Sequence, residues 1–107
     1  SYIEPHTATR LRQWLKANFK TSEYPIWVTI YKKSSGKQSL SYEQVLEEAI
    51  CFGLIDTQTK TIDELRYAIC LRRRKAGSNW TAANREIARQ MIIQGRMTEA
   101  GRKVLPA

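Results

Sequence analysis

The sequence predicts an α+β fold, with a small antiparallel sheet of about three strands packed with three to four helices in the order α-β-α-β-β-α-α. Three observations lead to this class. Apolar residues recur at helical spacing near both ends of the chain. Between these regions lie segments whose residues alternate in character, as in the strands of a sheet. At 107 residues, of which 42% are hydrophobic and 26% charged, the chain suits one domain that spans residues 1–107.

The first helix is expected over Ala8–Phe19, where apolar residues recur every three or four positions. Thr7 precedes it as a suitable N-cap, and basic residues such as Arg12 are expected on its outer face. Ile26–Lys32 follows as a strand rich in β-branched and aromatic residues. Because both sets of alternating residues are apolar or amphipathic, the strand is expected to be central and covered on both faces.

The second helix is expected over Tyr42–Phe52. Ser41 and Gln44 form a capping-box pattern at its start, and Gly53 suits the position that ends it. Two strands are then expected at Leu54–Thr59 and Leu65–Arg73, joined by a turn.

In the second of these strands the residues alternate, so that one face is expected to carry Leu65, Tyr67, Ile69 and Leu71 and the other Arg66, Ala68, Cys70 and Arg72. A third helix is expected from a cap at Ser78 or Asn79 to about Gln94, with an apolar stripe of Trp80, Ala83, Ile87 and Met91. A short last helix is expected from Thr98 through Leu105.

The charge is distributed unevenly along the chain. The formal net charge is +8, with 18 Lys and Arg residues against 10 Asp and Glu residues. Residues 1–64 hold eight basic and eight acidic residues, whereas residues 65–107 hold ten basic residues and only Glu86 and Glu99. This excess in the C-terminal part of the chain points to an anionic partner.

No segment is expected to cross a membrane, because the longest apolar run, Ala49–Ile55, is far shorter than the ~20 residues that a spanning helix needs. No signal peptide is visible, so a cytoplasmic location is expected, although a processed N-terminus would leave the periplasm open. Cys51 and Cys70 are expected to be reduced and buried, since two cysteines do not make a disulfide framework.

Six short motifs, in order and over about Arg10 to Gly101, resemble those of the YdeI/OmpD-associated family of bacteriocin-protection proteins. They are Trp14-Leu15-Lys16-Ala17-Asn18, Trp27-Val28-Thr29-Ile30-Tyr31-Lys32-Lys33, Leu40-Ser41-Tyr42-Glu43, Cys51-Phe52-Gly53-Leu54-Ile55-Asp56, Ser78-Asn79-Trp80-Thr81 with Asn84, and Gly95-Arg96-Met97-Thr98-Glu99-Ala100-Gly101. The chain departs from the family at Leu54, where Trp is usual, and at Arg73-Arg74-Lys75-Ala76, where the family often has Pro-Arg-x-Pro. The resemblance implies a role in stress or bacteriocin protection rather than a known reaction.

The sharpest local signal for function is a basic cluster. Its proposed contact residues are Arg72, Arg73, Arg74, Lys75, Arg85 and Arg89. The first hypothesis is a non-enzymatic protein that binds an unidentified partner through this basic C-terminal face. The alternative assigns the same face to nucleic acid, with phosphate contacts that give affinity without sequence readout. Trp80 could then stack on a base, but a place in the core is the favoured interpretation.

A small enzyme that uses Asp56 and Cys51 is the third and weakest hypothesis. A nucleophilic cysteine needs a base, and the one histidine, His6, lies near the N-terminus. One histidine and two separated cysteines do not make a zinc site, so neither a metal nor a cofactor is expected. Asp56 is expected instead to neutralise an arginine of the basic half.

Overall fold

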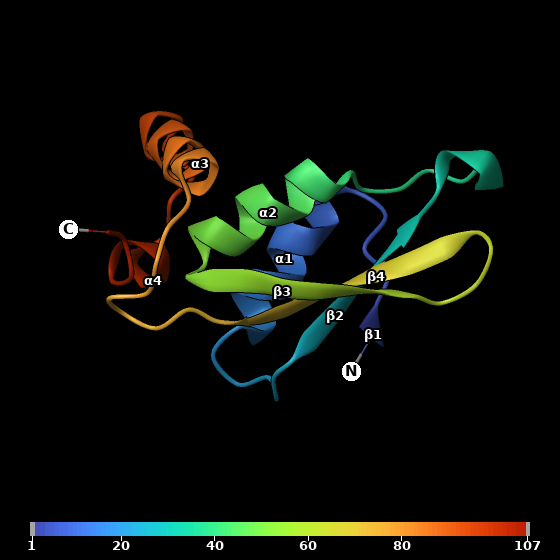
Figure 1. Ribbon diagram of the computed structural model, residues 1–107, viewed down its shortest axis with the longest axis horizontal. Helices are drawn as coiled ribbons and strands as arrows, with labels where there is room; N and C mark the ends of the chain where they lie inside the picture. The colour runs from blue at the N-terminus through green and yellow to red at the C-terminus, as the bar shows by residue number, and fades with distance from the viewer. Residues whose placement is uncertain (1, 107) are drawn as a thin grey trace.

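The computed structural model describes residues 2–106 and has an α+β fold (Figure 1). Its helices are α1 (Ala8–Asn18), α2 (Tyr42–Cys51), α3 (Ala82–Ile93) and α4 (Glu99–Arg102), with a short 3-10 turn, η1, at Lys33–Ser35. Its strands are β1 (Tyr2–Ile3), β2 (Ile26–Tyr31), β3 (Leu54–Thr61) and β4 (Arg66–Arg73). The predicted fold class is therefore confirmed.

The sheet has four strands in the order β1-β2-β4-β3 and is mixed rather than antiparallel. β2 pairs with β4, and β4 with β3, in antiparallel fashion, whereas β1 runs parallel to β2. The prediction of about three antiparallel strands missed β1. A two-residue strand is too short to show an alternating pattern, so nothing in the local sequence marks it.

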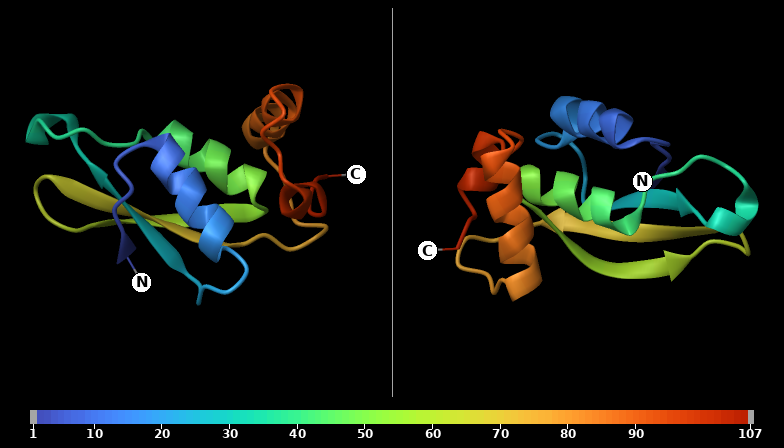
Figure 2. Two further views of the ribbon diagram at one scale, coloured as in Figure 1. Left: turned by 180° about the vertical axis from the view of Figure 1, so that it is seen from behind. Right: turned by 90° about the horizontal axis from the view of Figure 1, so that it is seen from above.

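Helices α1 and α2 lie on one face of the sheet, and α3 and α4 pack at one end (Figure 2). The hydrophobic core lies beneath α1 and α2 and includes Ile26, Val28 and Ile30, all of which are buried. β2 is central, as expected, but within residues 2–106 no helix covers its second face (Figure 2). We call this second face, toward which Trp27, Thr29 and Tyr31 point by alternation, the helix-free face.

Both faces of β4 are buried in its middle part. Ile69 and Leu71 belong to the core beneath the helices, but Ala68 and Cys70 are also 0% exposed. Leu65, which was predicted to share a face with Ile69 and Leu71, lies before the strand and is 44% exposed. Small side chains on the helix-free face are covered by the larger side chains around them, which the alternating pattern does not reveal.

The helix ends follow local chemistry where a strong cap is present. The Thr7 side chain accepts a hydrogen bond from the backbone N–H of Arg10, and Ser41 with Gln44 forms the complete predicted capping box. Gly53 follows α2 with a φ of +74°, a conformation that favours glycine. These three predictions are confirmed.

The two C-terminal helices are shorter than predicted. The N-cap of α3 is Thr81, whose side chain accepts a hydrogen bond from Asn84, rather than Ser78 or Asn79. Trp80 therefore precedes the helix, where it is 9% exposed and part of the core, and α3 buries Ala88 and Met91. The last helix begins as expected after Thr98 but ends at Arg102 rather than Leu105. None of the helices within residues 2–106 is long and apolar enough to cross a membrane.

A buried ion cluster joins α1, α2 and the loop that precedes α4. Glu48 is 1% exposed, and its carboxylate lies 2.9 Å from the guanidinium of Arg12 and also pairs with Arg96. Arg12 donates a second hydrogen bond, of 2.5 Å, to the carbonyl oxygen of Arg96. The expectation that Arg12 lies on the outer face of α1 is wrong, because the buried carboxylate requires a cation beside it.

Candidate anion-binding site

The predicted basic face is not one continuous surface. Arg72 and Arg73 are both exposed, but they are neighbours on β4 and so point to opposite faces of the sheet. Arg72 lies on the helix-free face. Arg73 lies on the other side, where its guanidinium donates a 2.7 Å hydrogen bond to the backbone carbonyl of Lys20.

Arg74 is buried rather than available on the surface. It is 5% exposed, and its guanidinium lies 3.9 Å from the centroid of the Trp80 ring. One of its nitrogens makes long, 3.4 Å contacts to Ser78 and Asn79, while Nε and Nη2 have no hydrogen-bond partner within residues 2–106. Burial lowers the pKa of Arg74, and the charge of Asp56 works in the opposite direction.

The remaining three predicted residues lie after β4. Lys75 and Arg85 are exposed, Arg85 on α3. Arg89 is exposed as well, but it holds the carboxylate of Glu86 through two hydrogen bonds, of 3.0 and 2.6 Å. Because Arg89 is already paired with a carboxylate, it offers less to an anionic partner than Lys75 or Arg85 does.

The structure places two of the predicted arginines beside lysines from distant parts of the chain. Two adjoining hollows share Phe19, Lys20 and Ala100 and have volumes of about 150 and 370 Å³. The first also contains Arg73 and Arg74, and the second contains Lys103. We call these two hollows together the basic groove. Among its lining residues within 2–106, the cations are Lys20, Arg73, Arg74 and Lys103, and the one carboxylate is Glu99.

Aromatic rings form much of the first hollow, and one of them holds Arg73. Phe19 packs on Phe52 with ring centroids 5.3 Å apart. The Arg73 guanidinium lies 4.9 Å from the centroid of Tyr24, whose hydroxyl donates a 2.6 Å hydrogen bond to the carbonyl of Phe19. Burial raises the pKa of Tyr24, and the neighbouring Arg73 guanidinium works in the opposite direction. These contacts orient Arg73 before any ligand binds.

The opposite wall of the groove is α4, which is seated on the end of α2. The carbonyl of Cys51 accepts hydrogen bonds from the backbone N–H and the hydroxyl of Thr98, at 3.1 and 2.5 Å. At Gly101, a Cβ atom would collide with the carbonyl of Cys51 and the sulfur of Met97. The close approach of the two backbones therefore fixes the wall that carries Ala100 and Lys103.

Lys20 and Lys103 were missed in the sequence prediction. They lie far from the arginine run along the chain, and the segment after α1 meets β4 through the tertiary contacts of Arg73 with the carbonyl of Lys20 and with the ring of Tyr24. No local pattern signals such a pairing. The resulting array of guanidinium and ammonium groups is suited to binding carboxylates or phosphates.

Of the two residues of the enzyme hypothesis, Cys51 is buried and Asp56 is partly exposed. Cys51 is 0% exposed, and burial raises the pKa of its thiol, which disfavours the nucleophilic thiolate. Asp56 accepts a 2.5 Å hydrogen bond from the hydroxyl of Tyr42. The expected ion pair between Asp56 and an arginine is not present within residues 2–106. The same part of the chain contains no cluster of residues that could hold a metal ion.

Comparisons with known proteins place the chain in a family without assigning an activity. No curated protein and no solved structure matches it significantly. One family model, described as a domain of unknown function, matches residues 3–104, which is nearly the whole chain. The protein therefore belongs to the DUF8412 family.

Proposed function

We propose that the protein is a non-enzymatic binding protein that holds an anionic partner protein in the basic groove. The observation that carries this proposal is the gathering of the exposed Lys20, Arg73 and Lys103, with the buried Arg74 beside them, around two adjoining hollows. Among the lining residues within 2–106, the only carboxylate is that of Glu99. The resemblance to the YdeI/OmpD-associated family supports a role in stress or bacteriocin protection through such a partner.

The state of the groove cations favours ligand binding over a purely structural role. Arg12 and Arg96 in the ion cluster have a carboxylate beside them, whereas Lys20, Arg73 and Lys103 have none within ion-pair distance among residues 2–106. Arg73 is already oriented by the carbonyl of Lys20 and the ring of Tyr24, so it loses little freedom when an acidic group arrives. The groove cations together also raise the rate of encounter with a negatively charged surface.

The shape of the groove favours an acidic protein segment over a duplex. Its hollows, of about 150 and 370 Å³, have the size of side chains, and they are lined by the rings of Phe19 and Phe52 as well as by cations. A segment that alternates acidic and apolar residues would satisfy both features. Sequence-nonspecific binding of nucleic acid is the second candidate, favoured by the exposed Arg72 and Lys75 at the end of β4 and the exposed Arg85 on α3.

The proposal is tested by reversing charge in the groove and elsewhere. The double variant Lys20→Glu with Arg73→Glu changes the groove, and Lys32→Glu with Lys33→Glu makes the same change in net charge at an exposed site near η1. The probes are a fluorescent peptide of alternating Glu and Leu, a duplex DNA and a single-stranded DNA, followed by anisotropy from low to high salt. We expect the groove variant to weaken peptide binding at least tenfold and the control variant to change it little.

Three results would change the conclusion. Equal losses in both variants would mean that the peptide responds to overall charge, which contradicts a groove site. Tight duplex binding that is lost in the groove variant and falls steeply with salt would favour the nucleic-acid candidate. Absence of binding to all three probes at low salt would overturn both candidates.

A further inference from the structure

The helix-free face carries an aromatic pair that is open to solvent. Tyr2 on β1 is 50% exposed, and its ring stacks on Trp27 of β2 with centroids 5.8 Å apart and planes 13° apart. The two residues are partners in the parallel pairing of β1 with β2. Lys60 on β3 reaches across the sheet and donates a 3.2 Å hydrogen bond to the Tyr2 hydroxyl. Its ammonium lies 5.9 and 5.8 Å from the two ring centroids.

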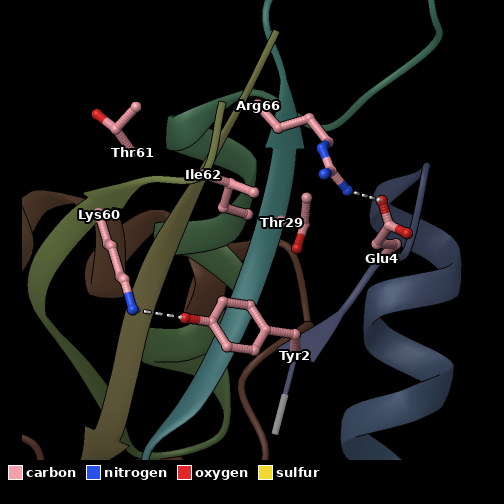
Figure 3. Close-up of a pocket in the computed structure, with 7 residues that line it drawn as sticks. All are labelled: Tyr2, Glu4, Thr29, Lys60, Thr61, Ile62 and Arg66. Atoms are coloured by element: carbon pink, nitrogen blue, oxygen red, sulfur yellow. Dashed lines mark hydrogen bonds and ion pairs between the residues drawn. The ribbon is translucent and has the colours of Figure 1, made fainter. Parts of the chain in front are cut away.

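A hollow of about 440 Å³ lies beside this pair. Its lining residues are Tyr2, Glu4, Thr29, Lys60, Thr61, Ile62 and Arg66 (Figure 3). In the close-up, Lys60 and Arg66 lie on different sides of the hollow, with Thr29 between them. Thr29 pairs with Ala68 in the sheet, so two small residues form the base of a depression between larger side chains.

A second aromatic pair lies further along β2. Tyr31 stacks on His6 with centroids 5.6 Å apart, and its ring also contacts the guanidinium of Arg66 at 5.9 Å. Trp27, Thr29 and Tyr31 point to the same face, so the two pairs stand at either end of the hollow. At ~3.3 Å per residue along a strand, the two platforms are roughly 13 Å apart. Because one small aromatic molecule cannot reach both pairs, this spacing suits a polymeric ligand with several flat rings.

The cations beside the aromatic rings differ in whether a carboxylate already pairs with them. Arg66 is paired with Asp63 at 2.9 Å and with Glu4 at 3.9 Å, so its charge is already neutralised. Lys60 has no carboxylate within ion-pair distance among residues 2–106. Arg72 is exposed on the same face, two residues beyond Cys70, the partner of Trp27 in the sheet. Free cations therefore flank the Tyr2–Trp27 pair on the strands β3 and β4.

We propose that the helix-free face binds single-stranded nucleic acid, with bases stacking on the Tyr2–Trp27 and Tyr31–His6 pairs and phosphates contacting Lys60 and Arg72. Exposed rings on an open sheet face match the flat faces of unpaired bases, which a duplex keeps inside its stack. The lysine and the arginine complement the phosphates that accompany those bases. This site is separate from the basic groove, which lies at the end of the sheet where α4 packs.

The experiment compares a 12-nucleotide single strand, the duplex of the same sequence and a mononucleotide as probes of the full chain. We expect the single strand to bind at least tenfold more tightly than the duplex, and ring resonances of Tyr2 and Trp27 to shift. Tyr2→Ala should weaken single-strand binding about tenfold, whereas Tyr2→Phe should retain it, because stacking uses the ring and not the hydroxyl. Lys60→Gln should reduce the slope of log affinity against log salt concentration by about one, which corresponds to the loss of one phosphate contact.

The controls separate this proposal from the groove proposal. The double variant Lys20→Glu with Arg73→Glu should leave the Tyr2 and Trp27 shifts in place even where it abolishes peptide binding. Circular dichroism checks that Tyr2→Ala folds, which is expected for an exposed residue in a two-residue edge strand. Any of three results would overturn the proposal. They are equal affinity for duplex and single strand, unchanged single-strand affinity in folded Tyr2→Ala, and binding of the mononucleotide without binding of the single strand.

Discussion

The ion cluster around Glu48 and the basic groove use arginine in opposite ways. In the cluster, Arg12 and Arg96 converge on a carboxylate that is 1% exposed and neutralise it. In the groove, Arg74 is 5% exposed and stacks on Trp80, but among residues 2–106 no carboxylate lies within ion-pair distance of it. The difference shows that burial of an arginine does not reveal its role; the presence or absence of a partner does.

The same comparison shows that the net charge of a segment does not tell which of its cations are unpaired. The formal charge of +8 resides in residues 65–107, yet Arg66, Arg89 and Arg96 from that part are all engaged in ion pairs. Lys20, from the neutral part of the chain, contributes to the groove. Charge that is available to a partner is therefore distributed differently from charge along the sequence.

The largest expected effect is on the ion cluster. Arg12→Met leaves the buried carboxylate of Glu48 with only Arg96, so we expect the free energy of unfolding to fall by about 3 kcal/mol. Arg10→Met, on the exposed side of the same helix, should change it by about 0.5 kcal/mol or less. Urea denaturation of both variants measures the difference. Equal effects would mean that the cluster contributes no more than a surface arginine does.

Arg74→Met should have a much smaller effect, and of opposite sign. The variant loses a cation–π contact with Trp80 of about 2 kcal/mol, but it also removes a buried charge that has no ion-pair partner in the described part of the chain. We expect the free energy of unfolding to stay unchanged or to rise by about 1 kcal/mol. A loss as large as that of Arg12→Met in the same urea experiment would contradict the distinction between the two sites.

The next prediction concerns the hydrogen bond between Tyr42 and Asp56, the carboxylate whose charge also acts on Arg74. Burial, followed by the hydrogen bond to Asp56, raises the pKa of Tyr42 to about 12. The stabilisation linked to this shift is present below pH 10 and is lost as the pH rises through about 12. Asp56→Asn should lower the pKa of Tyr42 only part of the way to its ordinary value, because burial remains. NMR titration of the Tyr42 ring measures this, and an unchanged pKa would exclude Asp56 as a cause.

The smallest effect is expected at the surface pair of α3. Hydrogen bonds from Arg89 and Gln90 lower the pKa of Glu86 to about 2. The linked stabilisation is present above the ordinary value of 4.5 and is lost as the pH falls through about 2. Arg89→Gln should return the pKa of Glu86 most of the way to 4.5 with little change in thermal stability, since both side chains are exposed. NMR titration of Glu86 would show whether the pair forms in solution.

Short-range features of this fold were predictable because their chemistry is local. Thr7, Ser41 with Gln44, and Gly53 each act on backbone groups within a few residues, and all three were identified from the sequence. The half-buried position of Arg12 was not, because it depends on Glu48, which lies 36 residues away. The strand β1 was missed because two residues show no period.

The candidate site was predictable only in part, for the same reason. The arginine run identified Arg73 and Arg74, which do lie in the groove, but it also included Arg89, whose charge is held by Glu86. Lys20 and Lys103 reach the groove only through tertiary contacts. The helix-free face was interpreted as covered because its aromatic residues have the composition of a buried strand, and composition does not state whether a helix lies above them.

The packing of α4 on α2 fixes the shape of the groove independently of the side chains that give the groove its charge. The wall is positioned by backbone atoms, through the approach of Gly101 and the hydrogen bonds of Thr98 to the Cys51 carbonyl. Lys20 and Lys103, by contrast, are exposed side chains that can be replaced without disturbing that seat. Members of one family could therefore diverge in the ligand they accept by surface substitution alone, while Gly101 and Thr98 preserve the same binding geometry.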